Sequence, residues 1–125
     1  MPEPKTLLEL AGADLKPATV GNATLLLIDY QNEYIAGTDL HAILGEAARK
    51  DIIIAGFMTH MCVSSTARAA LDLGYRVTID AGACATRDLP DGAGSRIDAD
   101  VVHRVAFVEL SDRFAIIARD SEELA

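Results

Sequence analysis

Four short aliphatic runs divide the chain at regular intervals. Each run is nearly continuous rather than alternating, which is the pattern of a strand buried on both faces of a parallel sheet. The four predicted strands are "ATLLLIDY" (23–30), "DIIIAGF" (51–57), "YRVTID" (75–80) and "FAIIA" (114–118).

Between these runs, apolar residues recur at helical spacing. We predict helices over residues 39–50, 62–74 and 97–112, and a loop over 82–95. Asp39 is suited to cap the first helix, and Gly74 is a common signal for the end of the second.

The alternation of strands and helices predicts right-handed βαβ crossovers, and so a three-layer α/β/α fold with a parallel sheet of about four strands. We expect one domain over residues 1–125, with residues 1–22 as an N-terminal arm. Ligands of such folds bind beyond the carboxyl ends of the strands. Two sequence features fall at that edge, Asp29 and the "GFMTHMC" stretch that ends at Cys62.

Composition narrows the function classes. The 125 residues carry a net charge of −8, with a mean hydropathy of +0.21 and an isoelectric point near 4.7. This charge repels phosphate backbones and anionic lipids, so we expect no nucleic-acid or membrane partner. No run is long enough to span a bilayer and no signal peptide is evident, which favours a cytoplasmic protein. Cys62 and Cys84 lack metal-ligand spacing, so we expect two reduced thiols, no metal and no cofactor.

Cys62 stands where a strand passes into a helix. Backbone amides at a helix N-terminus stabilise a thiolate, and Asp29 at the end of the neighbouring strand could accept the thiol proton. Spacing alone leaves a second interpretation open, in which Cys62 is an inert buried residue and Asp29 a loop cap.

Longer motifs favour the first interpretation. Asp29, Gln31, Asn32, Glu33 and Tyr34 match the pattern Asp-x-Gln-Asn-[Asp/Glu]-[Phe/Tyr]. The pattern Gly-x-x-Thr-x-x-Cys-Val-x-x-Thr-x-x-x-Ala is matched by Gly56, Thr59, Cys62, Val63, Thr66 and Ala70. In both motifs the chain resembles the isochorismatase-like family of cysteine hydrolases.

The resemblance implies a hydrolase that acts on a small amide, carbamoyl or vinyl-ether substrate. It implies Cys62 as the nucleophile, Asp29 as the base, and an oxyanion hole made by the amides of Met58 and Cys62, with a cis peptide between Phe57 and Met58. Gln31 and His60 are candidate substrate-binding residues, and the alternative for His60, a solvent-facing loop residue, is favoured by its position in a loop that the family varies.

The family's catalytic lysine has no match in this chain. It lies in a segment that is missing between Tyr34 and Thr38, unless the sequence skips residues there. Lys50 is predicted roughly 20 Å from the site, at the far end of its strand, and Lys5 and Lys16 lie in the arm. The alternative function is therefore a catalytically silent family member that acts as an oligomeric binding module.

The missing segment also predicts a bare sheet edge. The strand that carries Asp29 would lie inside the family's sheet, whereas here one of its edges would be open, so we expect a homo-oligomer or coverage by the arm. Cys84 is predicted to be a small packed residue, and His41 and His103 are predicted to lie on the surfaces of helices.

Overall fold

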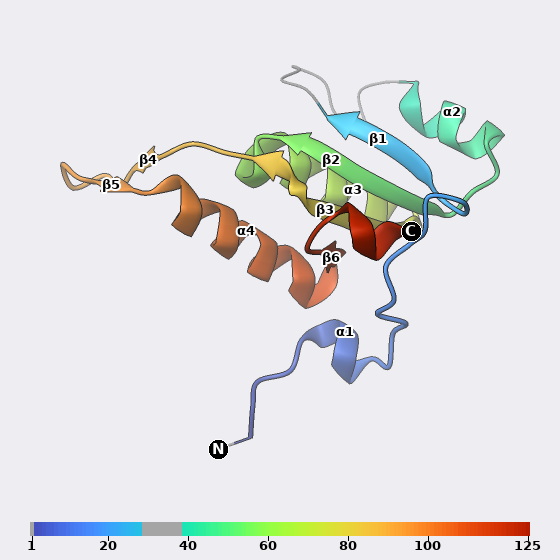
Figure 1. The fold of residues 1–125 in the computed structure, drawn as a ribbon, viewed down its shortest axis with the longest axis horizontal. Helices are drawn as coiled ribbons and strands as arrows, with labels where there is room; N and C mark the ends of the chain where they lie inside the picture. Colours follow the sequence, from blue (N-terminus) through green and yellow to red (C-terminus); the bar gives the residue numbers. More distant parts are fainter. Residues whose placement is uncertain (1, 29–38) are drawn as a thin grey trace.

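The computed structural model describes residues 2–28 and 39–125 (Figure 1). Its main sheet has four parallel strands in the order β1-β2-β3-β6. The strands are β1 (Thr24–Ile28), β2 (Asp51–Phe57), β3 (Arg76–Ala85) and β6 (Ile116–Ala118). The predicted α/β fold with a parallel four-stranded sheet is confirmed.

Helices α2 (Leu40–Glu46), α3 (Ser64–Asp72) and α4 (Ala99–Arg113) cover one face of the sheet, and α3 lies behind it in Figure 1. The short helix α1 (Leu7–Leu10) lies in the arm and contacts α4. The main core lies between this face and the helices, and its largest fully buried side chains include Ile52 and Ile54 of β2, Ile79 of β3 and Leu110 of α4. Along β2, Ile52 and Ile54 face this core, whereas Ile53 between them is buried on the opposite face. A strand buried on both faces has a continuous aliphatic sequence, as predicted.

The second face of the sheet is covered by the N-terminal arm and by the 3-10 turn η3 (Ser121–Leu124). Ile53 and Ala118 pack there against Ala18 of the arm and Leu124 of the turn. Both covering segments pass in front of the sheet in Figure 1. The predicted arm is thus a packed part of the fold.

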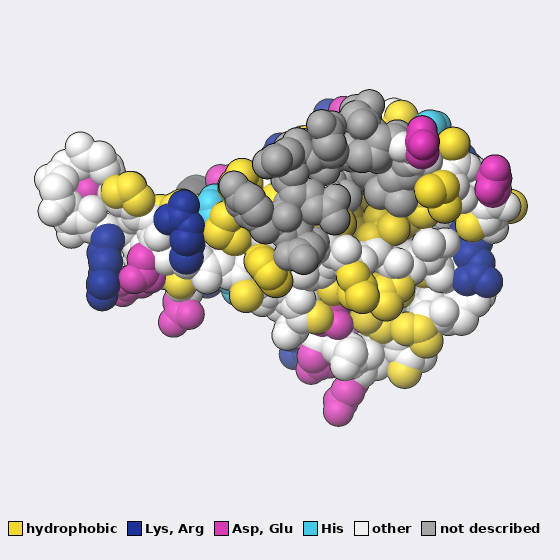
Figure 2. Space-filling view, turned by 90° about the horizontal axis from the view of Figure 1, so that it is seen from above, with side chains coloured by type: hydrophobic (Ala, Val, Ile, Leu, Met, Phe, Trp, Pro, Cys, Tyr) yellow, Lys and Arg dark blue, Asp and Glu magenta, His cyan; other side chains and the backbone are white. Residues whose placement is uncertain are grey.

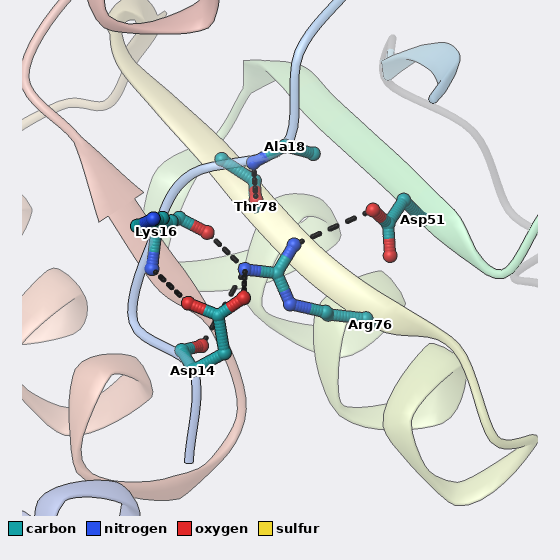
Figure 3. A network of polar contacts seen from close by, with 6 residues as sticks. All are labelled: Asp14, Lys16, Ala18, Asp51, Arg76 and Thr78. Atoms are coloured by element: carbon teal, nitrogen blue, oxygen red, sulfur yellow. Dashed lines mark hydrogen bonds and ion pairs between the residues drawn. The ribbon is translucent and has the colours of Figure 1, made fainter. Parts of the chain in front are cut away.

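Arg76 fastens the arm to the sheet (Figure 3). Its guanidinium lies 3.4 Å from the Asp51 carboxylate and 3.8 Å from that of Asp14, and it donates to the carbonyl of Lys16. Two residues further along the arm, the amide of Ala18 donates to the buried hydroxyl of Thr78 at 3.0 Å. These contacts join the arm to β2 and β3.

β1 is the terminal strand of the sheet among the described residues. Leu26 packs into the core, whereas Leu25 is 55% exposed and Leu27 is 75% exposed on the opposite face. Figure 2 looks onto the β1 side of the sheet and shows hydrophobic side chains beside the atoms drawn in grey. An exposed apolar edge strand can pair with a strand of another chain, which supports the expected homo-oligomer. The oligomer itself stays a prediction.

The largest differences from the predicted boundaries are in β3 and α2. β3 continues to Ala85, and an antiparallel pair of β4 (Leu89–Pro90) and β5 (Arg96–Ile97) follows it and projects from the molecule (Figure 1). The prediction of a loop over 82–95 was therefore wrong in part. Cys84 and Ala85 pair with β2, although glycine and alanine, which are frequent in this stretch, have low strand propensity. α2 ends at Glu46 rather than at residue 50, and Ile43 is exposed.

α3 ends where predicted. Gly74 has φ +90°, and the amide of Tyr75 donates to the carbonyl of Ala70 at 3.0 Å. The helix thus ends with Gly74 in a left-handed conformation, which glycine adopts without steric cost. The interval from Tyr34 to Thr38, where a segment of the family is predicted to be missing, lies outside the described residues.

Candidate functional site

A single turn of π-helix, η2 (Thr59–Val63), connects the carboxyl end of β2 to α3 and carries Cys62. The carbonyl of Met58 accepts the amides of Met61 at 3.0 Å and Val63 at 3.2 Å, which starts the turn. The peptide bond between Phe57 and Met58 is cis. Cys62 therefore lies at the carboxyl edge of the sheet, at the beginning of a continuous helical segment.

The Cys62 residue is only 2% exposed. Neither of the two hydrophobic clusters formed by described residues includes it, although Val63 beside it belongs to the main core. The predicted base Asp29 and the predicted substrate-binding residue Gln31 lie outside the described residues, so their roles stay predictions.

Thr59 begins the turn and is fully buried. Its hydroxyl donates to the carbonyl of Ala85 at the end of β3, at 3.1 Å, and lies 2.8 Å from Nδ1 of His103 on α4. One side chain thus joins the turn, the sheet and a helix. These contacts fix where the turn leaves β2.

His60 is attached to the segment that follows β3. Its Nδ1 lies 2.5 Å from the hydroxyl of Thr86. Burial, and secondarily the nearby charge of Arg87, lower the pKa of His60 below its ordinary value. The lowered pKa favours the neutral imidazole, and the bond to Thr86 does not use Nε2. Substrate contact by His60 stays a prediction.

The prediction that His103 is a surface residue was wrong. It is half-buried, bonds to Thr59, and packs edge-on against Phe107 with 4.4 Å between ring centroids. The sequence holds a signal for this, since His103 shares the i, i+3, i+4, i+7 spacing of the buried residues Ala106, Phe107 and Leu110. His41 is exposed on α2, as predicted, and its Nδ1 lies 2.9 Å from the hydroxyl of Tyr75.

Two further side chains come from the carboxyl half of β3. Cys84 lies opposite Gly56 of β2 and packs against the main core, and burial raises the pKa of its thiol to about 11. A thiol held protonated in this way is a packing residue rather than a second nucleophile, as predicted. Sequence reasoning missed Asp80, a carboxylate that is 6% exposed and accepts the amide of Gly82 at 3.1 Å.

The three lysines lie on other parts of the surface. Lys50 precedes β2, and its Nζ lies 5.4 Å from the centre of the Tyr75 ring, at the amino end of the sheet. Lys16 contacts Arg76 through its carbonyl, and Lys5 lines an outer groove with Arg68 and Val108. None is seen to contact the turn that carries Cys62 within the described residues.

The described residues form no cluster of three or more His, Cys, Asp or Glu side chains that could hold a metal ion. In the same part of the chain, no helix has the length and apolar character needed to cross a membrane.

A family model described as the isochorismatase domain matches residues 34–120. The chain belongs to the isochorismatase family. It is 32% identical over 120 residues to the isochorismatase-like protein asqB of Emericella nidulans, a match that covers 91% of this chain and 81% of that protein. It is 34% identical over 91 residues to a streptothricin hydrolase of Streptomyces noursei, covering 71% of this chain but 33% of the hydrolase.

Solved structures support the same fold. An isochorismatase from Pseudomonas putida superposes with a TM-score of 0.86 at 24% identity, covering 98% of this chain and 100% of that chain. A pyrazinamidase/nicotinamidase from Streptococcus mutans superposes with a TM-score of 0.56 at 27% identity, covering 67% of this chain and 41% of that chain. This isochorismatase-family chain thus spans less than half the length of the streptothricin hydrolase and the nicotinamidase.

Proposed function

We propose that this isochorismatase-family chain is a cysteine hydrolase that uses Cys62 to cleave a small amide or carbamoyl substrate. The observation that carries the proposal is the position of Cys62, in the helical turn directly beyond the carboxyl end of β2 and inside the segment that matches the family. Ligands of parallel sheets bind at this edge, and the amides of a helical first turn support a thiolate there.

In the proposed reaction the sulfur of Cys62 attacks the substrate carbonyl carbon. A carbon–sulfur bond forms, and the carbonyl π electrons move to oxygen, where the amides of Met58 and Cys62 would stabilise the negative charge. Asp29 takes the thiol proton and returns it to the leaving nitrogen as the carbon–nitrogen bond breaks. Water then cleaves the thioester, which releases a carboxylic acid and restores the thiol.

The substrate class rests on relatives of this family. A hydrolase of streptothricin and an enzyme named for nicotinamide are among them, and the second name denotes a carboxamide substrate. The neutral His60 and Gln31 are proposed substrate contacts. Vinyl-ether hydrolysis is the other reaction that the family resemblance implies, and it need not use the cysteine.

A second candidate function is a catalytically silent binding module. The positions of the lysines favour it, because Lys50 contacts Tyr75 and Lys16 contacts Arg76, both away from the turn that carries Cys62. Without a cation near Asp29 and Cys62, a thiolate has less electrostatic support.

The experiment that separates the two candidates uses the whole chain with nicotinamide and pyrazinamide as probes. We expect ammonia release and a transient acyl adduct in the intact mass, both abolished by Cys62→Ala. The matched control Cys84→Ala removes the other thiol of the chain and is expected to keep activity. Turnover that survives Cys62→Ala would overturn the nucleophile, and a wild-type chain that turns over neither probe and forms no adduct would favour the silent module.

A further inference from the structure

The hydroxyl of Thr59 has two polar neighbours but one proton. It donates this proton to the carbonyl of Ala85, which can only accept. The contact of 2.8 Å between the same hydroxyl and Nδ1 of His103 is therefore a hydrogen bond only if the imidazole donates. The arrangement assigns the proton of neutral His103 to Nδ1 and leaves Nε2 as the acceptor.

We propose that His103 is a positioning residue, whose Nδ1–H holds Thr59 and through it the turn that carries Cys62. The inference rests on the proposed function of Cys62 and adds a residue from α4, 41 positions beyond the nucleophile in the sequence. His103 acts through Thr59 and has no contact with a reacting atom in this proposal.

The surroundings of His103 suit this role. Phe107 packs against its ring at 75° between the ring planes, one helical turn further along α4, and so restricts its rotation. Thr59 is fully buried, so that an unpaired hydroxyl lone pair there would find no water to replace the histidine. A catalytic group must be held within a fraction of an ångström, and such precision comes from neighbours whose own positions are fixed.

A second bond holds the adjacent residue of the turn. His60 is joined to Thr86 just beyond β3, whereas Thr59 is joined to Ala85 and to α4. The turn is thus fastened on the β3 side by both residues, and on the α4 side by His103. Loss of His103 is expected to leave the turn in place but free to move away from α4.

The first measurement is the tautomer of His103 in the whole chain, labelled with ¹⁵N-histidine and observed by long-range ¹H–¹⁵N correlation at pH 8. We expect a proton on Nδ1, and we expect Thr59→Val to remove this preference. A histidine that serves only as packing would show no such dependence on Thr59. A proton on Nε2 in the wild-type chain would overturn the proposal.

The second measurement is the rate at which iodoacetamide modifies Cys62, in a Cys84→Ala background that leaves one thiol. His103→Leu should slow modification about fivefold, the ratio that corresponds to a net hydrogen bond of about 1 kcal/mol. Thr59→Val also removes the bond to the carbonyl of Ala85 and should slow modification at least as much. The double variant should be no slower than Thr59→Val, since His103 has no hydroxyl left to hold in that variant. His103→Asn places an N–H near the position of Nδ1 and should restore most of the rate.

The outcomes separate this inference from the proposed function. If Cys62 in the parent reacts no faster than a model thiol, the activated nucleophile is lost, yet the tautomer and the rate ratios still test the bond. If the parent is activated but His103→Leu and His103→Asn react alike, positioning by His103 is overturned and the nucleophile stands. Circular dichroism of each variant detects unfolding, and an unfolded His103→Leu variant leaves the Asn variant and the tautomer to decide.

Discussion

Gly56 of β2 lies directly against the backbone of Ile28 in β1. A Cβ atom built on Gly56 would fall 1.9 Å from the carbonyl oxygen of Ile28, and the glycine has φ +131°, in a region that residues with side chains rarely adopt. Two requirements therefore coincide at one position, immediately before the turn that carries Cys62. Only glycine meets both.

We predict that Gly56→Ala lowers the free energy of unfolding by about 2–4 kcal/mol, because the methyl group must displace β1 or distort β2. Urea denaturation followed by circular dichroism measures the change. The matched control is Gly45→Ala in α2, where a Cβ would meet nothing within 4 Å, and which should be neutral or stabilising by up to about 1 kcal/mol. Equal effects of the two substitutions would contradict the close approach.

Gly56 also illustrates what the sequence could reveal. The aliphatic runs predicted the four strands because burial on both faces leaves a pattern that local sequence shows directly. The motif around Cys62 placed the nucleophile turn, since the residues of such a turn are close in sequence. The contacts of His103 and the path of the arm could not be found in this way, because they depend on pairings across 44 and 60 residues. The spacing of His103 with Phe107 shows only that its face of the helix is buried.

Arg76 provides the second prediction. Its guanidinium, with a side chain that is 30% exposed, links Asp51 and Asp14 and bonds to the carbonyl of Lys16 (Figure 3). Arg76→Gln should free the arm and lower the free energy of unfolding by about 1 kcal/mol, a modest value because the pairs are partly solvated. We expect faster cleavage of the arm by thermolysin before Leu15, measured on the native protein by mass spectrometry.

The control for Arg76 is Arg96, which pairs with Asp88 and Asp98 but whose side chain is 71% exposed. Arg96→Gln should change stability by less than about 0.5 kcal/mol and leave cleavage in the arm unaltered. If Arg76→Gln leaves cleavage before Leu15 unchanged, the arm is held by Ala18 and Thr78 rather than by the arginine.

The edge strand β1 gives the third prediction. We predict that the chain self-associates, and that Leu27→Lys weakens the association, because a lysine on an edge strand opposes pairing with a second chain. Analytical ultracentrifugation across a range of concentrations measures the effect. Val108→Lys on α4 is the control, since Val108 is similarly exposed, at 63%, but lies on a helix. A wild-type chain that remains monomeric at every concentration would contradict the prediction.

Cys84 gives the last prediction, which concerns how the free energy of unfolding changes with pH. The direction of this change follows from the burial of the thiol. Burial disfavours the thiolate and raises the pKa of Cys84 from 9.0 to about 11 in the folded chain. Above pH 9 the unfolded chain releases this proton while the folded chain keeps it, so deprotonation favours unfolding. The protonated thiol of Cys84 therefore stabilises the folded chain fully below about pH 9. This contribution to the free energy of unfolding should be lost as the pH rises from about 9 to about 11.

Tyrosines and lysines also titrate in this range, so the contribution of Cys84 is measured as the difference between two proteins. Urea denaturation of the wild-type chain at several pH values should show a steeper decline than that of Cys84→Ala. At pH 8 iodoacetamide should modify Cys84 more slowly than a model thiol, which peptide mapping can detect. Identical pH dependence in the two proteins, or modification of Cys84 as fast as that of a model thiol, would show that the Cys84 thiol is not protected by burial.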